Sequence, residues 1–213
     1  WRRIDDYIIS FRTDWSWAAL FADFDQDGYK DYYVTNGYRR YSRDNDFIRQ
    51  LKGIMGPDQK EIPPAKREEL YPEMPEIKDP NYIYRNNGDL TFTLVTEDWN
   101  MNQPSYSNGA AYADLDQDGD LDIVVNNIDG PAFLYRNNSI ENNNGNYLIC
   151  RFEGERPNDP VYNTKVTIEY GDGKTQYQEF HPTRGYASSM GEEVHFGLGN
   201  VRNIEQLKVV WPN

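Results

Sequence analysis

The chain has 213 residues, enough for one or two domains with buried cores. Asp and Glu outnumber Lys and Arg by 35 to 22, and the resulting net charge of −13 argues against nucleic acid as a partner, because its phosphates would be repelled. The sequence contains no run of about 18 apolar residues, so no membrane span is predicted.

Short strand-like runs separated by turn pairs fill the first two thirds of the chain. The earliest, "DDYIISF" at residues 5–11, follows Trp1 in mid-pattern, so we expect the chain to be part of a longer polypeptide. Later runs include "DYYVTN", "NYIYRN", "LDIVVNN" and "AFLYRN", bounded by Asn-Gly, Asp-Gly or Asn-Asn. This pattern predicts an all-β fold with tight turns.

An internal repeat organises this region. "ADFDQDGYKD" at residues 22–31 recurs as "ADLDQDGDLD" at 113–122, and "YRNN" follows each copy, at 84–87 and 135–138. The first copy holds 40 more residues between these two marks than the second. Without them, each unit is close to the size of a four-stranded propeller blade. We therefore expect residues 1–145 to form a partial β-propeller of about two blades.

The additional residues form an insertion at about 38–78. "DNDFIRQLKGI" has apolar residues at helical spacing, and "PPAKREEL" can begin a second helix at its prolines, so the insertion is predicted to be partly helical. It begins with a cluster of basic and aromatic residues that suits a ligand surface. The alternative is a solvated segment that packs over the blade edge. The cluster comprises Tyr38, Arg39, Arg40, Tyr41 and Arg43.

Residues 146–213 show regular alternation typical of a separate small β domain, which we expect to be sandwich-like. "TKVTIEY" and "KTQYQEFH" flank "GDG" at 171–173, which predicts a hairpin. "EEVHFGLG" and "EQLKVVWP" predict two further strands, each with its apolar residues on one face.

The aspartates of the two repeated loops point to a cation. Two carboxylates about 4 Å apart repel by about 4 kcal/mol at an effective dielectric of about 20, so several converging on one point need a counterion. Calcium takes about six to eight oxygens, and aspartates at loop positions 1, 3, 5 and 9 with a carbonyl at position 7 can wrap one ion. The predicted ligands of two calcium ions are Asp23, Asp25, Asp27, Tyr29 (carbonyl) and Asp31, and then Asp114, Asp116, Asp118, Asp120 (carbonyl) and Asp122.

Other interpretations of these loops are weaker. Position 12, where an EF-hand carries its bidentate Glu, is Val34 in one loop and Val125 in the other, and both lie in strand-like runs. Merely solvated acidic turns would not need the same spacing twice. A catalytic acid and base would need unlike environments, whereas these two loops are alike. We therefore expect neither loop to be catalytic.

These motifs carry a family resemblance. The two repeats resemble FG-GAP or VCBS-type calcium-binding propeller blades. Residues 146–213, through "GYASS", "VHFGLG" and "LKVVWP", resemble the ASPIC/UnbV module that follows such repeats in bacterial surface proteins and in cartilage acidic protein. The arrangement is similar to the C-terminal part of long exported proteins of Bacteroidetes type. The resemblance implies an extracellular or bacterial cell-surface location and places calcium on the aspartates named above.

Two functional hypotheses follow. The first is a calcium-stabilised, non-catalytic binding or scaffold module of a cell-surface protein, with a glycan or another surface protein as ligand and no enzyme activity of its own. The second is the accessory portion of a larger polysaccharide-processing enzyme whose chemistry lies elsewhere. Propellers host both kinds of function, so the fold does not separate them.

Overall fold

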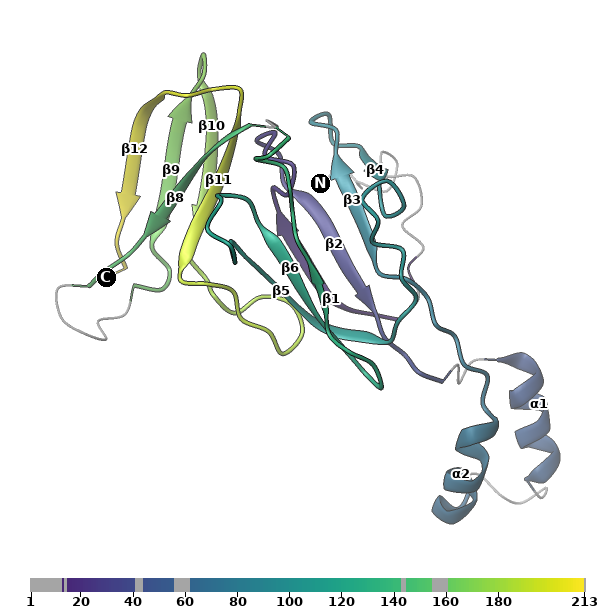
Figure 1. Cartoon of the computed structure of the whole chain (residues 1–213). Coiled ribbons are helices and arrows are strands. Elements are labelled where there is room, and N and C mark those ends of the chain that lie inside the picture. The colour runs from purple at the N-terminus through teal and green to yellow at the C-terminus, as the bar shows by residue number, and fades with distance from the viewer. Residues whose placement is uncertain are drawn as a thin grey trace.

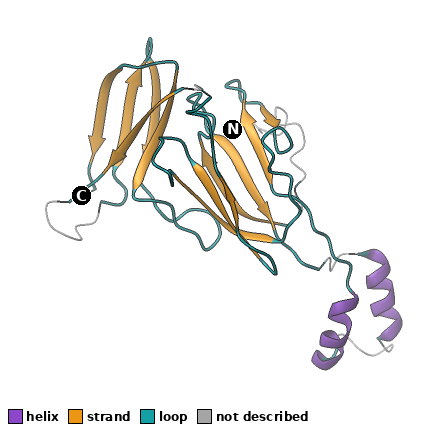
Figure 2. Ribbon diagram, viewed as in Figure 1, coloured by secondary structure: helices purple, strands orange, loops and turns teal. Residues whose placement is uncertain are grey.

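A computed structural model describes residues 13, 15–40, 44–55, 62–142, 145–154 and 161–212. The expected strand at 5–11 and two members of the basic cluster, Tyr41 and Arg43, lie outside the described residues. Strands dominate the fold and two short helices lie in the insertion, which confirms the all-β prediction (Figures 1 and 2). None of the described helices has the length and apolar character that crossing a membrane requires.

The first repeat folds into a four-stranded antiparallel meander. Its strands pair in chain order, so each strand neighbours the next along the sequence. Alternate residues of the first strand, Ala18, Leu20 and Ala22, are buried, as expected for a sheet with one face in the core. The strands are β1 (Ser16–Ala22), β2 (Asp31–Asn36), β3 (Tyr82–Asn86) and β4 (Phe92–Leu94).

The second repeat reproduces this sheet with three strands, β5 (Ser107–Ala113), β6 (Asp122–Asn127) and β7 (Phe133–Tyr135). Its register matches that of the first sheet: Ala22 pairs with Asp31, and Ala113 pairs with Asp122. We expected a unit of four-strand size. The second sheet ends at β7 because the following residues form a turn and then lead into the C-terminal module.

The two sheets lie side by side as adjacent blades, with β1 next to β5 (Figure 1). The Thr35 hydroxyl of the first blade donates a 2.7 Å hydrogen bond to the Asn108 carbonyl of the second. One buried apolar cluster takes residues from both blades, which fixes them to each other. Its members are Ala18, Leu20, Ala22, Phe24, Tyr33, Ile83, Val95, Met101, Ala110, Leu121, Ile123 and Val125.

The insertion contains helix α1 (Asn45–Ile54) and helix α2 (Pro64–Leu70), followed by a 3-10 turn, Tyr71–Glu73. Asp44 caps α1 by accepting a 2.7 Å hydrogen bond from the Phe47 amide, and the predicted helical character of the insertion is confirmed. The expectation that this segment packs over a blade edge is wrong: both helices project away from the sheets (Figure 1).

The described members of the basic and aromatic cluster contact other parts of the chain. Tyr38 stacks on a neighbouring indole ring, with 4.8 Å between ring centroids. Arg39 pairs with Asp129 of the second blade at 2.7 Å, and Arg40 pairs with Glu76 at 2.9 Å. Arg40 is mostly buried, and it also donates to two carbonyls of the insertion. These side chains brace the base of the insertion, so they give little support to a ligand surface there.

The C-terminal module is a small sandwich of two antiparallel sheets, as expected. The predicted hairpin joins β9 and β10, and Asp172 (φ 60°) and Gly173 (φ 86°) turn the chain in the left-handed region. One sheet has the order β10-β9-β12 and the other pairs β11 with β8. The strands are β8 (Asn146–Arg151), β9 (Lys165–Tyr170), β10 (Lys174–Glu179), β11 (Glu193–Gly199) and β12 (Ile204–Val210).

The sandwich core takes side chains from both sheets. Val194, Phe196 and Leu198 of β11 are buried, as their alternation predicted, and they belong to one cluster with Val166 and Ile168 of β9. Leu207 and Val209 of β12 pair with Ile168 and Val166 of β9, so they share one face of the sheet as expected. Leu207 is nevertheless 51% exposed, because β12 is the edge strand of its sheet.

The connection between β10 and β11 docks on the blades. Gly185 approaches Leu20 of β1 and the Ala110 carbonyl of β5, and the Tyr112 amide lies 3.2 Å from the Met190 sulfur. Close packing also occurs on β11, where a Cβ at Gly197 would overlap the Asp23 carboxylate. The module is therefore packed directly against both blades.

We expect Gly197→Ala to lower the free energy of unfolding by about 1–3 kcal/mol, because the added methyl overpacks a closed contact with Asp23. Gly53→Ala in α1 is the matched control. Apart from the backbone of its own helix, no atom of the described residues lies within 4 Å of its added Cβ, and alanine favours the helix by up to about 1 kcal/mol. Urea unfolding of both variants measures the difference, and equal midpoints would show that the contact is loose.

Candidate metal centre

The two aspartate loops have the same backbone conformation. Gln26 and Gln117, at the fourth position, have φ values of 61° and 64°. Gly28 and Gly119, at the sixth position, have φ values of 97° and 103°, a region that glycine adopts without steric cost. The loops also sit at equivalent places, since each connects the first two strands of its blade.

In each loop the carboxylates at positions 1, 3 and 5 converge. Asp23, Asp25 and Asp27 form one triad, whose ligand oxygens all lie within 4.8 Å of one another. Asp114, Asp116 and Asp118 form a second triad with the same spacing. The structure therefore brings together six of the predicted ligand side chains, three in each loop.

Several of these oxygens are buried without a hydrogen-bond partner. Within the described residues, the unpartnered atoms include Asp23 Oδ1, Asp114 Oδ1 and Asp118 Oδ2. A buried anionic oxygen without a donor is costly, and a hard cation that such oxygens coordinate would remove the cost. The donor set and its unsatisfied oxygens thus fit a metal ion.

Burial and mutual repulsion disfavour the charged carboxylates. Burial, followed by the charges of Asp31 and Asp27, raises the pKa of Asp23 well above its usual value. Burial and the Asp27 charge raise the pKa of Asp25 to about 6, and burial and the Asp25 charge raise that of Asp31 to about 8. Burial also raises the pKa of Asp114 in the second loop. Without a counterion, Asp23, Asp25, Asp31 and Asp114 therefore bind protons more readily than an ordinary aspartate does.

The aspartates at position 9 lie outside the two triads and brace each loop. Asp31 accepts hydrogen bonds from the Phe24 and Asn86 amides, both at 2.9 Å. Asp122 accepts equivalent bonds from Leu115 at 3.1 Å and from the first Asn of the second "YRNN" at 2.8 Å. A carboxylate oxygen has a second lone pair, so the expected role of these two residues as ligands stays a prediction.

The two predicted carbonyl ligands lie at position 7. The Tyr29 amide donates to Asp27 Oδ1 at 2.8 Å, and the Asp120 amide donates to Asp118 Oδ1 at 3.1 Å. These equivalent bonds fix the loop around the fifth-position carboxylate. The Tyr29 and Asp120 carbonyls themselves remain predicted ligands.

A single carbonyl ties both loops to the sandwich. Gln26 Nε2 of the first loop donates a 2.9 Å hydrogen bond to the Gly119 oxygen of the second. His195 Nε2 of β11 lies 2.9 Å from the same oxygen and donates to it, because a carbonyl only accepts. The Gly199 amide donates to the Gln26 carbonyl at 2.8 Å. Sequence reasoning missed these residues, although the Gln repeated at position 4 was a visible signal.

His195 is suited to this place as a neutral ring. It is 7% exposed, and burial lowers its pKa. Its imidazole stacks on Tyr147 of β8, with 5.8 Å between ring centroids. Tyr147 in turn covers Gly119, where a Cβ would overlap the phenol ring. The second loop therefore needs glycine for its contact with the sandwich as well as for its turn.

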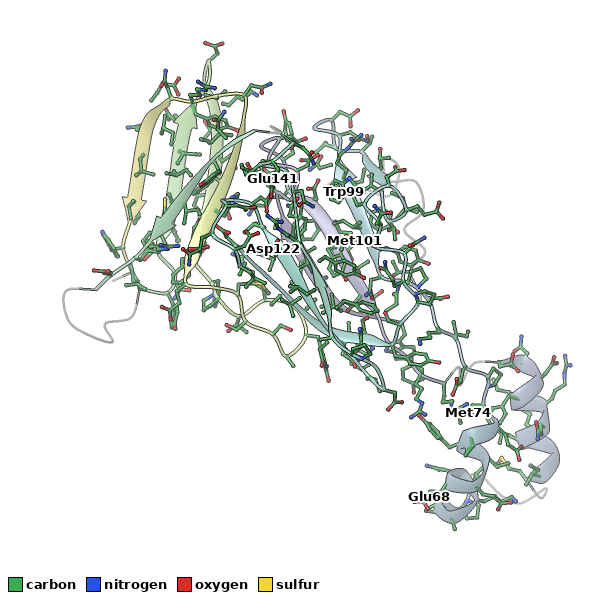
Figure 3. All side chains as sticks on the ribbon, viewed as in Figure 1. Glu68, Met74, Trp99, Met101, Asp122 and Glu141 are labelled. Atoms are coloured by element: carbon green, nitrogen blue, oxygen red, sulfur yellow. The ribbon has the colours of Figure 1, made fainter. Side chains whose placement is uncertain are left out.

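A cleft of about 520 Å³ opens between the blades, beside the loops. Aromatic rings, aliphatic side chains and asparagine amides line it, and an apolar lining with a few polar groups is typical of small-molecule sites. Trp99 and Met101 come from the segment that connects β4 to β5 along the chain, and they lie near each other (Figure 3). The lining includes Trp99, Asn100, Tyr135 and Asn138.

Two comparisons with known proteins agree with this architecture. Residues 76–125 match the family described as FG-GAP-like repeat, and residues 154–213 match the family described as ASPIC and UnbV. The first match contains the loop at 113–122. Cartilage acidic protein 1 of Homo sapiens is 39% identical over 57 residues, which are 26% of this chain and 9% of that protein. The chain thus matches a small part of the length of this relative.

The predicted resemblance is confirmed by these matches. The domain boundary expected at residue 146 stays a prediction. The ASPIC and UnbV match begins eight residues later, and the start of a match does not show where the domain starts. The chain thus has one segment similar to an FG-GAP-like repeat and, after it, one similar to ASPIC and UnbV, a combination that indicates a surface or extracellular module.

Proposed function

We propose that this chain is a calcium-stabilised, non-catalytic scaffold and binding module of an extracellular or bacterial cell-surface protein. The observation that carries the proposal is the position of the two carboxylate triads. Both lie where the blades meet the sandwich, and both contain buried oxygens without a partner. An ion in each loop would stabilise the joint between the two parts of the chain.

Calcium is the ion that suits these ligands. Each loop offers a crowd of carboxylates and a carbonyl, and calcium accepts about six to eight oxygens in flexible geometry. Magnesium prefers strict octahedral geometry and retains several waters. One ion would be held by Asp23, Asp25, Asp27, Asp31 and the Tyr29 carbonyl; the other would be held by Asp114, Asp116, Asp118, Asp122 and the Asp120 carbonyl.

The loops are suited to a structural role because each contacts several parts of the fold. The first loop reaches the sandwich through Gly28, which packs on the Tyr170 hydroxyl of β9. It also reaches the second loop through the bond from Gln26 to Gly119. Neutralising the triads would therefore stabilise both blades and the sandwich together, which is the role of a scaffold ion.

The cleft beside the loops is the place we propose for a ligand. A pyranose ring has apolar faces and hydroxyl edges, and the cleft offers the Trp99 and Tyr135 rings next to the Asn100 and Asn138 amides. This combination of ring faces and free amides suits a glycan. The insertion is less suited, since Tyr38, Arg39 and Arg40 contact their own chain.

The proposal excludes catalysis by the aspartates. The two loops have matching conformations and matching hydrogen bonds, whereas an acid and a base need different environments. An ion whose shell is filled by carboxylates and a carbonyl also leaves little room for a substrate.

Removal of calcium should destabilise the whole chain. Each site occupied at 100 times its Kd adds about 2.7 kcal/mol of stability. For a chain of this length, 1 kcal/mol moves the Tm by about 2–4 °C, so two sites should raise it by on the order of 10 °C. Calorimetry in EDTA, in calcium and in magnesium at equal concentration tests this expectation. An unchanged Tm on adding calcium would refute it.

Asp23→Asn and Asp114→Asn should each lower the number of bound calcium ions by one. Each change removes one charge from one triad and keeps an oxygen that can accept the amide hydrogen of Gly28 or Gly119. The control is Asp89→Asn, a fully exposed aspartate in a separate turn. Equilibrium dialysis with radioactive calcium gives the counts. Full occupancy in either triad variant would show that its loop is not a site.

Trp99→Ala should weaken glycan binding about tenfold or more, a loss of about 1.4 kcal/mol, because it removes a ring face from the cleft. A glycan array identifies the probe, and titration with that glycan gives the Kd. Tyr71→Ala, in the insertion, is the control and should bind normally. Loss of affinity only in the Tyr71 variant would move the ligand to the insertion. Glycan turnover in a parallel hydrolase and lyase screen would contradict a non-catalytic module.

A further inference from the structure

A third carboxylate triad adjoins the second aspartate loop. Asp118, Asp120 and Glu141 each offer an oxygen, and these oxygens lie within 4.8 Å of one another. Asp118 belongs to this triad and to that of Asp114 and Asp116. Glu141 comes from the turn that follows β7, and it lies with Asp122 where the blades meet the sandwich (Figure 3).

The Asp120 side chain is the second sign of an ion. It is fully buried, with 0% exposure. Its Oδ2 accepts a 3.1 Å hydrogen bond from the Ile140 amide, whereas its Oδ1 has no partner. Asp118 Oδ2 is also buried without a hydrogen bond, and the nearest cation is the Arg136 guanidinium at 3.6 Å. Two neighbouring buried anionic oxygens without a donor are costly unless a cation lies between them.

The turn that carries Glu141 is held in place by hydrogen bonds to both aspartate loops. The Ile140 amide is bound to Asp120, and the Ser139 hydroxyl donates to the Phe24 carbonyl of the first loop at 3.0 Å. The carboxylate of Glu141 therefore approaches the cluster from a braced backbone. A ligand set that is held in advance loses less conformational entropy when an ion binds.

Arg136 is the positive charge already present, and it does not balance the cluster. Its guanidinium lies 2.7 Å from Asp116, 2.5 Å from Glu141 and 3.6 Å from Asp118. It is 57% exposed and, within the described residues, makes no ion pair with Asp120. One positive charge thus faces the five carboxylates of the two triads, and it faces them from the solvent side.

The first loop provides an internal comparison. By the repeat offsets, Asp120 corresponds to Tyr29 and Glu141 corresponds to Leu90. Neither residue carries a carboxylate, and within the described residues Asp23, Asp25 and Asp27 form a single triad there. The additional carboxylates are therefore a property of the second loop alone.

We propose that Asp118, Asp120 and Glu141 form a further divalent-cation site, so that the second loop holds two calcium ions and the first holds one. The inference rests on the proposed calcium loops, because Asp118 would be shared between neighbouring ions. Three carboxylates leave open positions in a shell of about six to eight oxygens, and water can fill them on the exposed side of Glu141.

Calcium counting on the full chain tests the proposal. Equilibrium dialysis with radioactive calcium should find three ions in the unchanged protein and two in Glu141→Ala. Asp120→Asn should also bind two, because it keeps the main-chain carbonyl and an oxygen for the Ile140 amide while losing the charge. Glu97→Ala, an exposed glutamate away from the loops, is the matched control and should bind three.

The counts separate this proposal from the previous one. A count of two ions in both the unchanged protein and Glu141→Ala would mean that Arg136 alone balances the third triad. That result would overturn the further site and would leave the proposal for the two calcium loops intact. Fewer than two ions in the unchanged protein would overturn the proposed calcium loops. Three ions retained in both Glu141→Ala and Asp120→Asn would also show the third site to be wrong.

Discussion

Repulsion among buried carboxylates is the constraint on which this structure depends. The fold places two sets of aspartates at the joint between blades and sandwich, where burial raises the pKa of Asp23, Asp25 and Asp31. Such an arrangement is unfavourable unless a cation or protons neutralise it. Residues that serve only packing would not need these charges, and the clustered oxygens at the joint could hold a metal ion.

The hydrogen bonds around the loops explain how neutralisation at one point reaches the whole chain. The Gly119 carbonyl accepts from Gln26 of the other loop and from His195 of the sandwich. Gly197 allows β11 to lie directly on Asp23. A loop that changed conformation would break contacts with the neighbouring blade and with the sandwich together, so an ion bound there would act in domain assembly as well as in local folding.

Local patterns in the sequence predicted much of the fold. The spacing of aspartates and glycines specified both loops, and Asp172-Gly173 specified the hairpin, because these conformations depend on adjacent residues. The contact between His195 and Gly119, and the triad with Glu141, could not be predicted, because they join residues far apart in the sequence through tertiary packing. The projection of the insertion and the exposure of Leu207 likewise depend on which neighbours the sheets leave free.

Hydrogen exchange of the full chain, followed by mass spectrometry with calcium and with EDTA, tests the central claim most directly. The account predicts that removing calcium increases exchange in the loop at 22–31 and, to a similar extent, in β11, because the Gly199 amide is bound to the Gln26 carbonyl. Unchanged protection of both segments in EDTA, or a change confined to the loop with β11 still protected, would contradict the claim that ions hold the blades and the sandwich together.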